Sequence, residues 1–238
     1  MTLIELKEKL KQLILGYSNF SPSFSQSGED MILRGIFQRV FNGFYIDIGA
    51  YHPVIGSNTF YFYKFLGWTG INIEPNPDNF PLFEKMRSQD INLNMGISEK
   101  EQELNYYMVD QLPAMNTFSE EFLRTSNMYD HISRVKLIPT NTLKNILNKY
   151  HSENKAIDIM NIDVEGLDLQ VLNSNDWEKY RPKCIVIEVD NSALFKGKIH
   201  QFLSEKGYVI MGLTPVNTKI NSTCIYLDDN WIKDFSNY

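Results

Sequence analysis

Cysteine is scarce in this chain, with only Cys184 and Cys224 among 238 residues. Each lies within an apolar run, and the sequence has no zinc-binding spacing of cysteine and histidine. The scarcity excludes a domain held together by several disulfides. We expect two buried, reduced thiols, with a disulfide between them as the alternative.

Basic charge is also in short supply. The 23 lysines and arginines are outnumbered by 29 aspartates and glutamates, which gives a net charge of -6. Proteins that bind nucleic acid non-specifically carry a basic surface, so we expect no nucleic-acid partner. The hydrophobic content of 43% is that of an ordinary globular protein.

Long hydrophobic runs are absent. No apolar stretch approaches the roughly 18 residues that a membrane-spanning helix needs. The N-terminal segment alternates Leu and Ile with Lys and Glu, so it lacks the continuous apolar segment of a signal peptide. We therefore expect no membrane span and, by default, a cytoplasmic location.

Glycine is missing at two positions where a dinucleotide-binding turn needs it. The apolar run 44–48 leads into Gly49, but Tyr51 and His52 stand where the G-x-G-x-x-G pattern places further glycines. Those glycines let the backbone approach a pyrophosphate. Their absence argues against NAD or FAD. A tight turn shaped by Asp47 and Gly49, without any ligand, is the structural alternative.

Strand and helix patterns alternate along most of the chain. We expect strands at 44–48, 70–74, 91–97, 104–109, 157–163 and 184–190, and helices near 31–41, 57–66, 77–88, 140–151, 167–173 and 193–206. This alternation predicts a parallel sheet with helices on both faces. Tyr208–Leu213 and Thr223–Leu227 leave no room for a crossover helix and should pair as an antiparallel hairpin. The expected fold is a Rossmann-like α/β fold whose seven-stranded, mostly parallel sheet ends in this hairpin.

Two segments lie outside this alternation. Residues 1–42 are expected to form an N-terminal helical extension that starts with an amphipathic helix over residues 3–14. Residues 110–136 fit no element, and a stretch of this length in a compact domain is usually functional or mobile. We interpret it as a substrate lid, with a surface excursion that packs its own aromatic residues as the alternative. No linker or repeat is evident, so residues 1–238 are expected to form a single domain.

Glu74 ends the second predicted strand, and Pro75 follows it. An acid at the tip of an apolar strand needs a polar partner. A carboxylate accepts hydrogen bonds from both hydroxyls of a ribose, so we predict an adenosine-containing cofactor, with a helix cap as the alternative role. Because the turn at 49–52 does not suit a pyrophosphate, the cofactor should carry an amino-acid tail instead.

Two further loops complete the predicted cofactor site. Ser57, Asn58 and Thr59 are expected to donate hydrogen bonds to the carboxylate of the amino-acid tail. Backbone groups near Gly96 and Ile97 are expected to bond the edge of the adenine.

Acidic residues end two strands in the second half of the chain. Asp163 ends one predicted strand, and Glu188 and Asp190 end the next. If these strands are neighbours, the three carboxylates meet at one edge of the sheet, where crowding raises their pKa values and marks a functional site. We predict these three acids as catalytic candidates, together with His52 as a general base. Helix caps are the alternative role for any single acid.

A metal site is a further hypothesis for this edge. Asp163, Asp190 and Asn191 offer three oxygen ligands for a hard cation such as Mg²⁺ or Mn²⁺.

Several motifs in combination resemble the FkbM family of S-adenosylmethionine-dependent methyltransferases. They are Ser25–Asp30, Tyr45–Pro53, Ser57–Thr59, Gly67–Pro75, Asn94–Ser98, Ile162–Gly166 and Arg181–Glu188. The resemblance implies the class I methyltransferase fold and S-adenosylmethionine as cofactor. It implies cofactor contacts from Gln26, Asp47, Gly49, Ala50, Tyr51, Ser57, Asn58, Glu74, Gly96, Ile97 and Asp163. The metal set is similar to that of catechol-type O-methyltransferases, but Gly166 stands where those enzymes have a lysine base.

The resemblance implies methyl transfer to a hydroxyl. We therefore predict an O-methyltransferase that acts on a sugar or a nucleotide-linked sugar, such as a precursor of a capsule or surface polysaccharide. The alternatives are a methyltransferase for a polyketide or another small molecule, an NAD-dependent sugar-modifying enzyme, and a non-catalytic binding domain. The acceptor lies beyond the sequence, and a homo-oligomer is left open.

Overall fold

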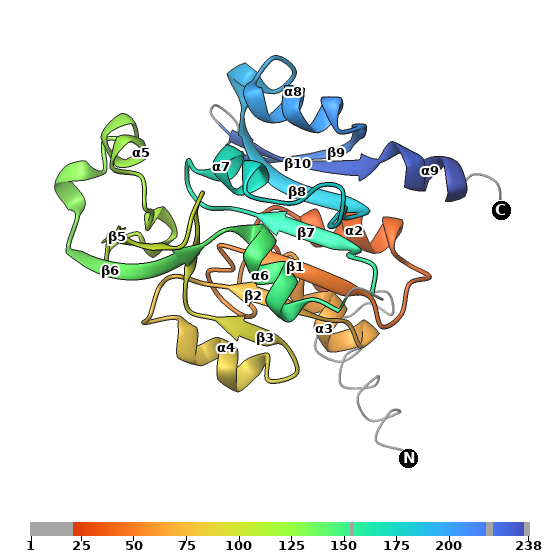
Figure 1. Ribbon diagram of the computed structural model, residues 1–238, viewed down its shortest axis with the longest axis horizontal. Helices are drawn as coiled ribbons and strands as arrows, with labels where there is room; N and C mark the ends of the chain where they lie inside the picture. Colours follow the sequence, from red (N-terminus) through yellow and green to blue (C-terminus); the bar gives the residue numbers. More distant parts are fainter. Residues whose placement is uncertain (1–20, 153–154, 218–220, 236–238) are drawn as a thin grey trace.

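The computed structural model describes residues 21–152, 155–217 and 221–235. Within these ranges, seven strands form one sheet in the order β3-β2-β1-β7-β8-β10-β9 (Figure 1). Their bounds are β1 Phe44–Ile48, β2 Thr69–Ile73, β3 Ile91–Leu93, β7 Ile159–Ile162, β8 Cys184–Asp190, β9 Tyr208–Asn217 and β10 Asn221–Asp228.

Five of these strands are parallel, and the last two form an antiparallel hairpin at one edge. The strand order reverses between β1 and β7, and ligands bind at such a switch point in open α/β sheets. A parallel sheet with this order and a terminal hairpin is the Rossmann-like class I methyltransferase fold, so the expected fold class is confirmed.

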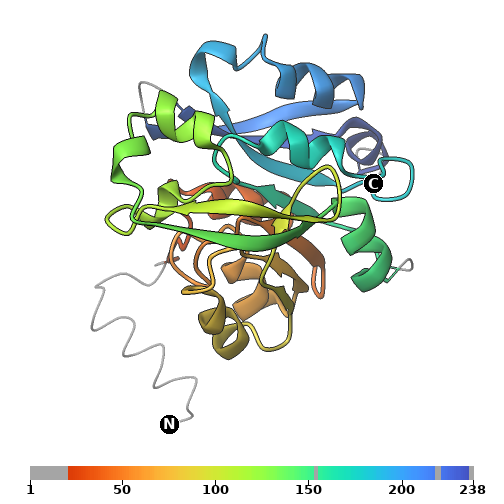
Figure 2. The same cartoon turned by 60° about the vertical axis from the view of Figure 1, so that its left-hand side comes forward.

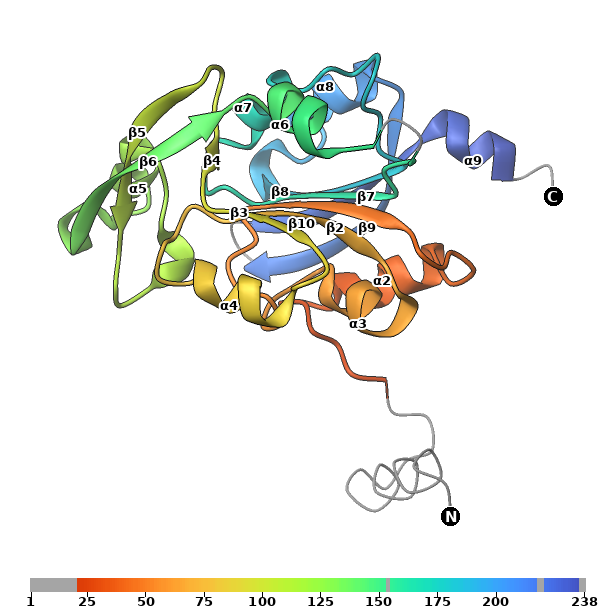
Figure 3. The ribbon, with the colours of Figure 1, turned by 60° about the horizontal axis from the view of Figure 1, so that its bottom comes forward.

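Helices cover both faces of the sheet (Figure 3). One face carries α6 (Leu143–Tyr150), α7 (Asp168–Asn173) and α8 (Lys198–Glu205). The other carries α2 (Glu29–Ile36), α3 (Phe60–Leu66) and α4 (Phe80–Met86), while α9 (Asp229–Phe235) follows β10. Both faces are therefore sealed from water, as a parallel sheet requires.

Alternation along β1 supplies both cores. Ile46 and Ile48 join the larger core, which also contains Leu143 and Leu147 of α6. Tyr45, one residue out of step, joins the second core with residues of α2 and α3. Successive side chains of a strand point to opposite faces, so this strand packs against both helical layers.

A second, three-stranded sheet was not expected. It has the order β4-β6-β5 and consists of β4 (Gly96–Ile97), β5 (Gln102–Met108) and β6 (Arg134–Asn141). Figures 1 and 2 show it beside the main sheet, with the segment between β5 and β6 extending from it. The prediction of one strand over 91–97 was wrong, because the side chain of Asn94 donates to the carbonyls of Glu74 and Pro75 and the chain leaves the main sheet there.

The strand β6 escaped prediction because its pattern is polar. Arg134, Lys136 and Pro139 interrupt its apolar residues, and proline is rare inside sheets. It is tolerated here because β4 reaches only Thr140 and Asn141, so β6 has a single neighbour at Pro139. The helix expected from residue 140 begins at Leu143 instead.

The expectations for the N-terminal helices, the cysteines and a membrane span have different outcomes. The helix predicted over 31–41 spans Glu29–Ile36, and the helix predicted over residues 3–14 lies outside the described residues. Cys184 and Cys224 are buried and free, as expected. Across the described ranges, no helix combines the length and the apolar character needed to cross a membrane.

Candidate active site

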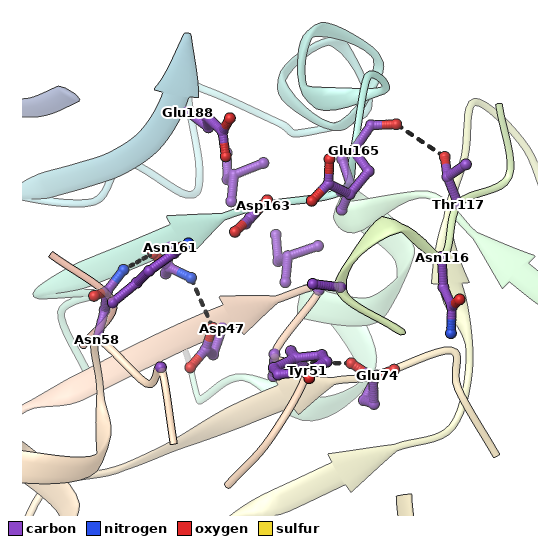
Figure 4. Close-up of a pocket in the computed structure, with 18 of the residues that line it drawn as sticks. Asp47, Tyr51, Asn58, Glu74, Asn116, Thr117, Asn161, Asp163, Glu165 and Glu188 are labelled. Carbon is purple, nitrogen blue, oxygen red and sulfur yellow. Dashed lines mark hydrogen bonds between the residues drawn. The ribbon is translucent and has the colours of Figure 1, made fainter. Parts of the chain in front are cut away.

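A cavity of about 980 Å³ opens at the carboxyl ends of β1, β2, β7 and β8 (Figure 4). Its remaining walls come from residues 23–29, from the segment between β5 and β6, and from the start of β10. The cavity therefore occupies the switch point of the sheet, where the fold places ligands.

Gly49 brings the turn after β1 against the end of β7. Its φ of 73° lies in the left-handed region, and a Cβ added there would be 1.8 Å from the carbonyl oxygen of Asp163. Only glycine fits this approach. Tyr51 also has a positive φ, of 54°, which is unusual for a residue with a side chain. Its ring lies beside Glu74 at the cavity wall (Figure 4).

Glu74 is held by two backbone amides. The amides of Tyr51 and Asn76 donate to its two oxygens at 2.6 and 2.7 Å. The side chain is 3% exposed, and burial raises its pKa to about 8 even though the two amides favour the charged form. Each oxygen keeps a free lone pair, so the carboxylate can still accept from a ligand hydroxyl.

Both carboxylate oxygens of Asp47 accept hydrogen bonds from protein side chains. Thr59 Oγ1 donates to its Oδ2 at 2.7 Å and Asn161 Nδ2 donates to its Oδ1 at 2.9 Å. Burial raises its pKa, and these donors together with Arg87 oppose the shift. The side chain of Asn161 in turn accepts from Asn58 Nδ2 at 2.9 Å. The Thr59 hydroxyl and the Asn58 Nδ2 thus each donate to a protein acceptor, and the expectation that Ser57, Asn58 and Thr59 donate to the amino-acid tail stays a prediction.

Three carboxylates gather at the other end of the cavity. Oxygens of Asp163, Glu165 and Glu188 lie within 4.8 Å of one another. Burial and Glu188 raise the pKa of Asp163 well above its usual value, while burial and Asp163 raise that of Glu165 to about 10. Burial also raises the pKa of Glu188, and a hydrogen bond from the side chain of Asn221 opposes this shift. Such a group is poised to hold protons at neutral pH.

The segment between β5 and β6 closes part of the cavity. It contains α5 (Glu120–Thr125) and short 3-10 helices at Pro113–Met115 and Tyr129–His131. Thr117 Oγ1 donates to the carbonyl of Glu165 at 2.8 Å. A Cβ added at Gly96 would lie 2.4 Å from the ring of Phe118, so that ring packs directly on the backbone of β4.

All eleven residues expected to contact the cofactor line the cavity. Of the catalytic candidates, Asp163 and Glu188 line it, whereas His52 and Asp190 do not. His52 Nδ1 accepts from the backbone amides of Val54 and Ile55, which uses that nitrogen to shape the turn.

The expected convergence of Asp190 and Asn191 with Asp163 is also wrong. Neither residue lines the cavity. The exposed carboxylate of Asp190 accepts from the backbone amide and the hydroxyl of Ser192, so it caps a 3-10 helix at Asn191–Ala193. The side chain of Asn191 accepts from the Ser222 hydroxyl at 2.6 Å. The metal set inferred from the sequence is therefore not assembled.

Sequence reasoning overlooked two cavity residues. Asn161 lies opposite Asp47 in the register of the neighbouring parallel strands, a signal that becomes visible only when the two strands are known to pair. Glu165 sits two residues after Asp163, but its φ of 51° and the positive φ of Gly166 turn the chain beyond the strand. No strand periodicity could have placed its carboxylate.

A family model described as Methyltransferase FkbM domain matches residues 47–210. The chain belongs to the FkbM methyltransferase family. Its activity is accordingly methyl transfer, which removes the NAD-dependent alternative and supports S-adenosylmethionine as the methyl donor. No curated protein matches the chain.

In a comparison with solved structures, this FkbM-family protein is similar to several methyltransferases at low sequence identity. A TehB-like S-adenosylmethionine-dependent methyltransferase from Corynebacterium glutamicum is 8% identical, with 94% of this chain and 97% of that chain covered and a TM-score of 0.43. A putative O-methyltransferase from Klebsiella pneumoniae is 10% identical, with 96% and 91% covered and a TM-score of 0.44. A 1,6-didemethyltoxoflavin-N1-methyltransferase from Burkholderia thailandensis is 10% identical, with 94% and 87% covered and a TM-score of 0.45.

Proposed function

We propose that the protein transfers a methyl group from S-adenosylmethionine to a hydroxyl of a sugar or sugar-containing precursor. The observation that carries this proposal is the group formed by Asp163, Glu165 and Glu188 at the wall of the cavity. In their ionised forms these carboxyls are proton acceptors, and they lie at the edge of the sheet where we also place the cofactor.

The cavity fits the methyl donor. Its volume of about 980 Å³ is at the upper end for ligand sites, which leaves room for an acceptor beside the donor. Glu74 would accept from the ribose hydroxyls, and the backbone near Gly96 and Ile97 would bond the adenine. Gly49, Ala50, Tyr51, Gln26 and their neighbours would surround the amino-acid tail.

The acids supply what O-methylation needs from the protein. Bound S-adenosylmethionine would supply an electrophilic methyl group. An alcohol does not lose its proton unaided at neutral pH, so a base must take that proton as the new O–C bond forms. We assign this role to Asp163, because its carboxylate lines the cavity, and because burial and Glu188 raise its pKa, which makes its ionised form a stronger proton acceptor.

The lining also favours a sugar as the acceptor. Carboxylates accept hydrogen bonds from several hydroxyls at once, and the aromatic ring of Phe118 or Phe122 can cover an apolar sugar face. Met95 and Met115 extend this apolar wall, which keeps a polyketide or another small-molecule hydroxyl as the second candidate. A cytoplasmic location is part of this proposal.

A divalent ion is a testable addition to this mechanism. With Asp190 and Asn191 outside the cavity, Glu165 and Glu188 would join Asp163 as ligands, since hard cations prefer carboxylate oxygens. Activity that EDTA removes and Mg²⁺ or Mn²⁺ restores would support the ion. Activity that is indifferent to EDTA would assign the proton transfer to the carboxylates alone.

A matched pair of substitutions tests the assignment of the base. Transfer of labelled methyl from S-adenosylmethionine is measured on free sugars, nucleotide-linked sugars and phenolic acceptors. We expect Asp163→Asn to lower kcat about 100-fold or more, the usual effect of losing a general base. Asp190→Asn should stay within about twofold, because that carboxylate only caps a short helix. Equal turnover of Asp163→Asn and the unmodified protein would overturn the assignment.

A further inference from the structure

Acidic side chains dominate the charge of the cavity lining. Among the described residues, six carboxyl side chains line the cavity, and no lysine, arginine or histidine does so. The six are Glu29, Asp47, Glu74, Asp163, Glu165 and Glu188. Glu74 lies at one end and the group around Asp163 at the other (Figure 4), so an anionic ligand would meet carboxyls in either half of the cavity.

A phosphate group needs donors that replace the water it loses on binding. Proteins supply them from arginine and lysine side chains, from glycine-rich turns, or from free amides at the start of a helix. The described lining has no basic side chain. The turn after β1 has Tyr51 and His52 where a phosphate-binding turn has glycines. Only helix starts are left as a source of donors.

The amides at the start of α2 already have acceptors within the chain. Ser25 Oγ accepts from the amides of Gly28 and Asp30 at 3.1 and 3.2 Å. The carboxylate of Glu29 accepts from the amide of Ser27 at 2.9 Å. The first turn of this helix also carries two acids, Glu29 and Asp30, so it repels a second anion rather than binding one.

The start of α3 is occupied in the same way. Ser57 Oγ accepts from the backbone amides of Thr59 and Phe60 at 3.3 and 3.1 Å. Arg87, which directly follows α4, is fully buried and donates to the hydroxyls of Ser57 and Thr59. It does not line the cavity, so its guanidinium is directed to the protein and not to a ligand.

The charge of this lining distinguishes the methyl donor from a nucleotide-linked sugar. S-adenosylmethionine carries a sulfonium and an ammonium beside a single carboxylate, so its net charge is positive and carboxyls attract it. A nucleotide-linked sugar carries a negative diphosphate and no cation. Ionised carboxyls repel that diphosphate, and protonated carboxyls would have to hold their protons more tightly beside it.

We propose that the methyl acceptor is a sugar unit without phosphate, so that this methylation follows the glycosyl transfer that removes the sugar from its nucleotide carrier. The proposal rests on the proposed function and narrows its acceptor to a neutral or cationic glycoside. In the supplying reaction, the bond from the anomeric carbon to the diphosphate oxygen breaks as a bond to an alcohol oxygen forms. The alcohol proton is released, and the nucleoside diphosphate is the leaving group.

Matched acceptors that differ mainly in charge test this proposal. Transfer of labelled methyl from S-adenosylmethionine is compared for a series of hexoses, each as its methyl glycoside, its 1-phosphate and its nucleoside-diphosphate derivative. The 1-phosphate is close in size to the methyl glycoside, so a difference between these two reports charge and not bulk. We expect kcat/KM for the glycoside to exceed that for both phosphorylated forms at least about tenfold, because a phosphate would lose water without gaining a cationic partner.

A substitution that adds a cation provides the converse test. Thr125 lines the cavity from the last turn of α5, and its hydroxyl donates to the carbonyls of Glu121 and Phe122 within that helix. Thr125→Arg should raise kcat/KM for the 1-phosphate relative to the glycoside several-fold, because a guanidinium pairs with phosphate. Thr125→Gln is the matched control, a long polar side chain without charge, and should leave this ratio unchanged.

The outcomes separate this proposal from the proposed function. Methylation of the 1-phosphate or of the nucleotide-linked sugar that equals or exceeds that of the glycoside would overturn the proposal while the proposed function stands. A ratio that Thr125→Arg and Thr125→Gln change equally would also overturn it, because charge would then not select the acceptor. If phenolic acceptors are methylated and no sugar is in any form, the sugar acceptor of the proposed function fails together with this proposal.

Discussion

At the scale of single residues, Glu74 has the clearest consequence for binding. It is held between two backbone amides in a buried position that raises its pKa to about 8. Hydroxyls of a ribose donate to the ionised form, so ligand binding should lower this pKa and release a proton. Binding that releases a proton is strengthened as the pH rises.

We therefore expect the affinity for S-adenosylhomocysteine to increase from pH 6 to about pH 8 and to level off above it. Calorimetry in buffers with different ionisation enthalpies would measure the released proton. Glu74→Gln should bind more weakly and with little dependence on pH, because an amide has only one oxygen for the two backbone donors. An affinity that falls over this range would contradict the role given to Glu74.

Glu165 shows how much a single backbone conformation contributes to the site. Its left-handed φ of 51° is followed by Gly166 with a φ of 94°, and together they turn the chain so that the carboxylate lies near those of Asp163 and Glu188. Left-handed conformations at a side-chain-bearing residue cost energy and gather at functional sites.

At the scale of elements, the segment between β5 and β6 covers part of the cavity. We propose that it acts as a substrate lid. In its support, Thr117 bonds the carbonyl of Glu165, Phe118 packs on Gly96, and Phe122 packs on Gly166. These contacts connect the segment to the Gly96 side of the cavity, where we propose that the adenine binds, and to its acidic end.

The lid proposal predicts a selective effect of Thr117→Val. Loss of the hydrogen bond to Glu165 should loosen the segment, raise KM for the acceptor several-fold, and leave the affinity for S-adenosylhomocysteine within about twofold, since one such bond contributes about 1 kcal/mol. Hydrogen exchange of amides in residues 113–126 should become faster in this variant.

The control for the lid is Thr69→Val. Thr69 begins β2, at the opposite end of this strand from the cavity, and its hydroxyl accepts a hydrogen bond from Lys155. This substitution should leave exchange in residues 113–126 unchanged. If Thr117→Val has unchanged exchange and an unchanged acceptor KM, the segment is a surface excursion that packs its own aromatic residues.

At the scale of the whole molecule, the buried acids give stability a definite dependence on pH. Burial raises the pKa of Glu74 from 4.5 to about 8 and that of Asp168 from 3.8 to about 7. Between these values the folded protein binds more protons than the unfolded chain, so the free energy of unfolding falls as the pH rises. This contribution is complete below about pH 4 and is lost as the pH passes through 7 to 8.

We expect the ligand-free protein to lose stability from pH 6.5 to 8.5, a window in which His52 and His151 are already neutral because burial lowers their pKa values. Denaturant unfolding across this window measures the slope. Saturating S-adenosylhomocysteine should make the slope shallower, because the bound ligand favours ionised Glu74. Stability that increases with pH over the same window would show that these acids are ionised in the folded protein.

The main sheet and one half of the site could be predicted from the sequence. The apolar strands, the short connection between β9 and β10, the turn at Gly49 and the acid that follows a strand at Glu74 are each local patterns that the sequence shows directly. They led to the fold class and, with the family resemblance, to eleven residues that line the cavity. The cysteine count alone excluded a framework of several disulfides, because a count does not depend on contacts between distant residues.

Tertiary structure decided the rest. Asp190 ends β8 and Glu165 follows β7 by three residues, yet Asp190 caps a 3-10 helix and Glu165 lines the cavity, because the backbone turns differently after the two strands. The polar strand β6 forms because β5 is available to pair with it. The hydrogen bonds of Arg87, at the end of α4, depend on the packing of β1 and of the loop before α3 around its side chain. Side-chain direction beyond a strand end and the partners of a buried charge depend on neighbours far along the chain, and no local pattern records them.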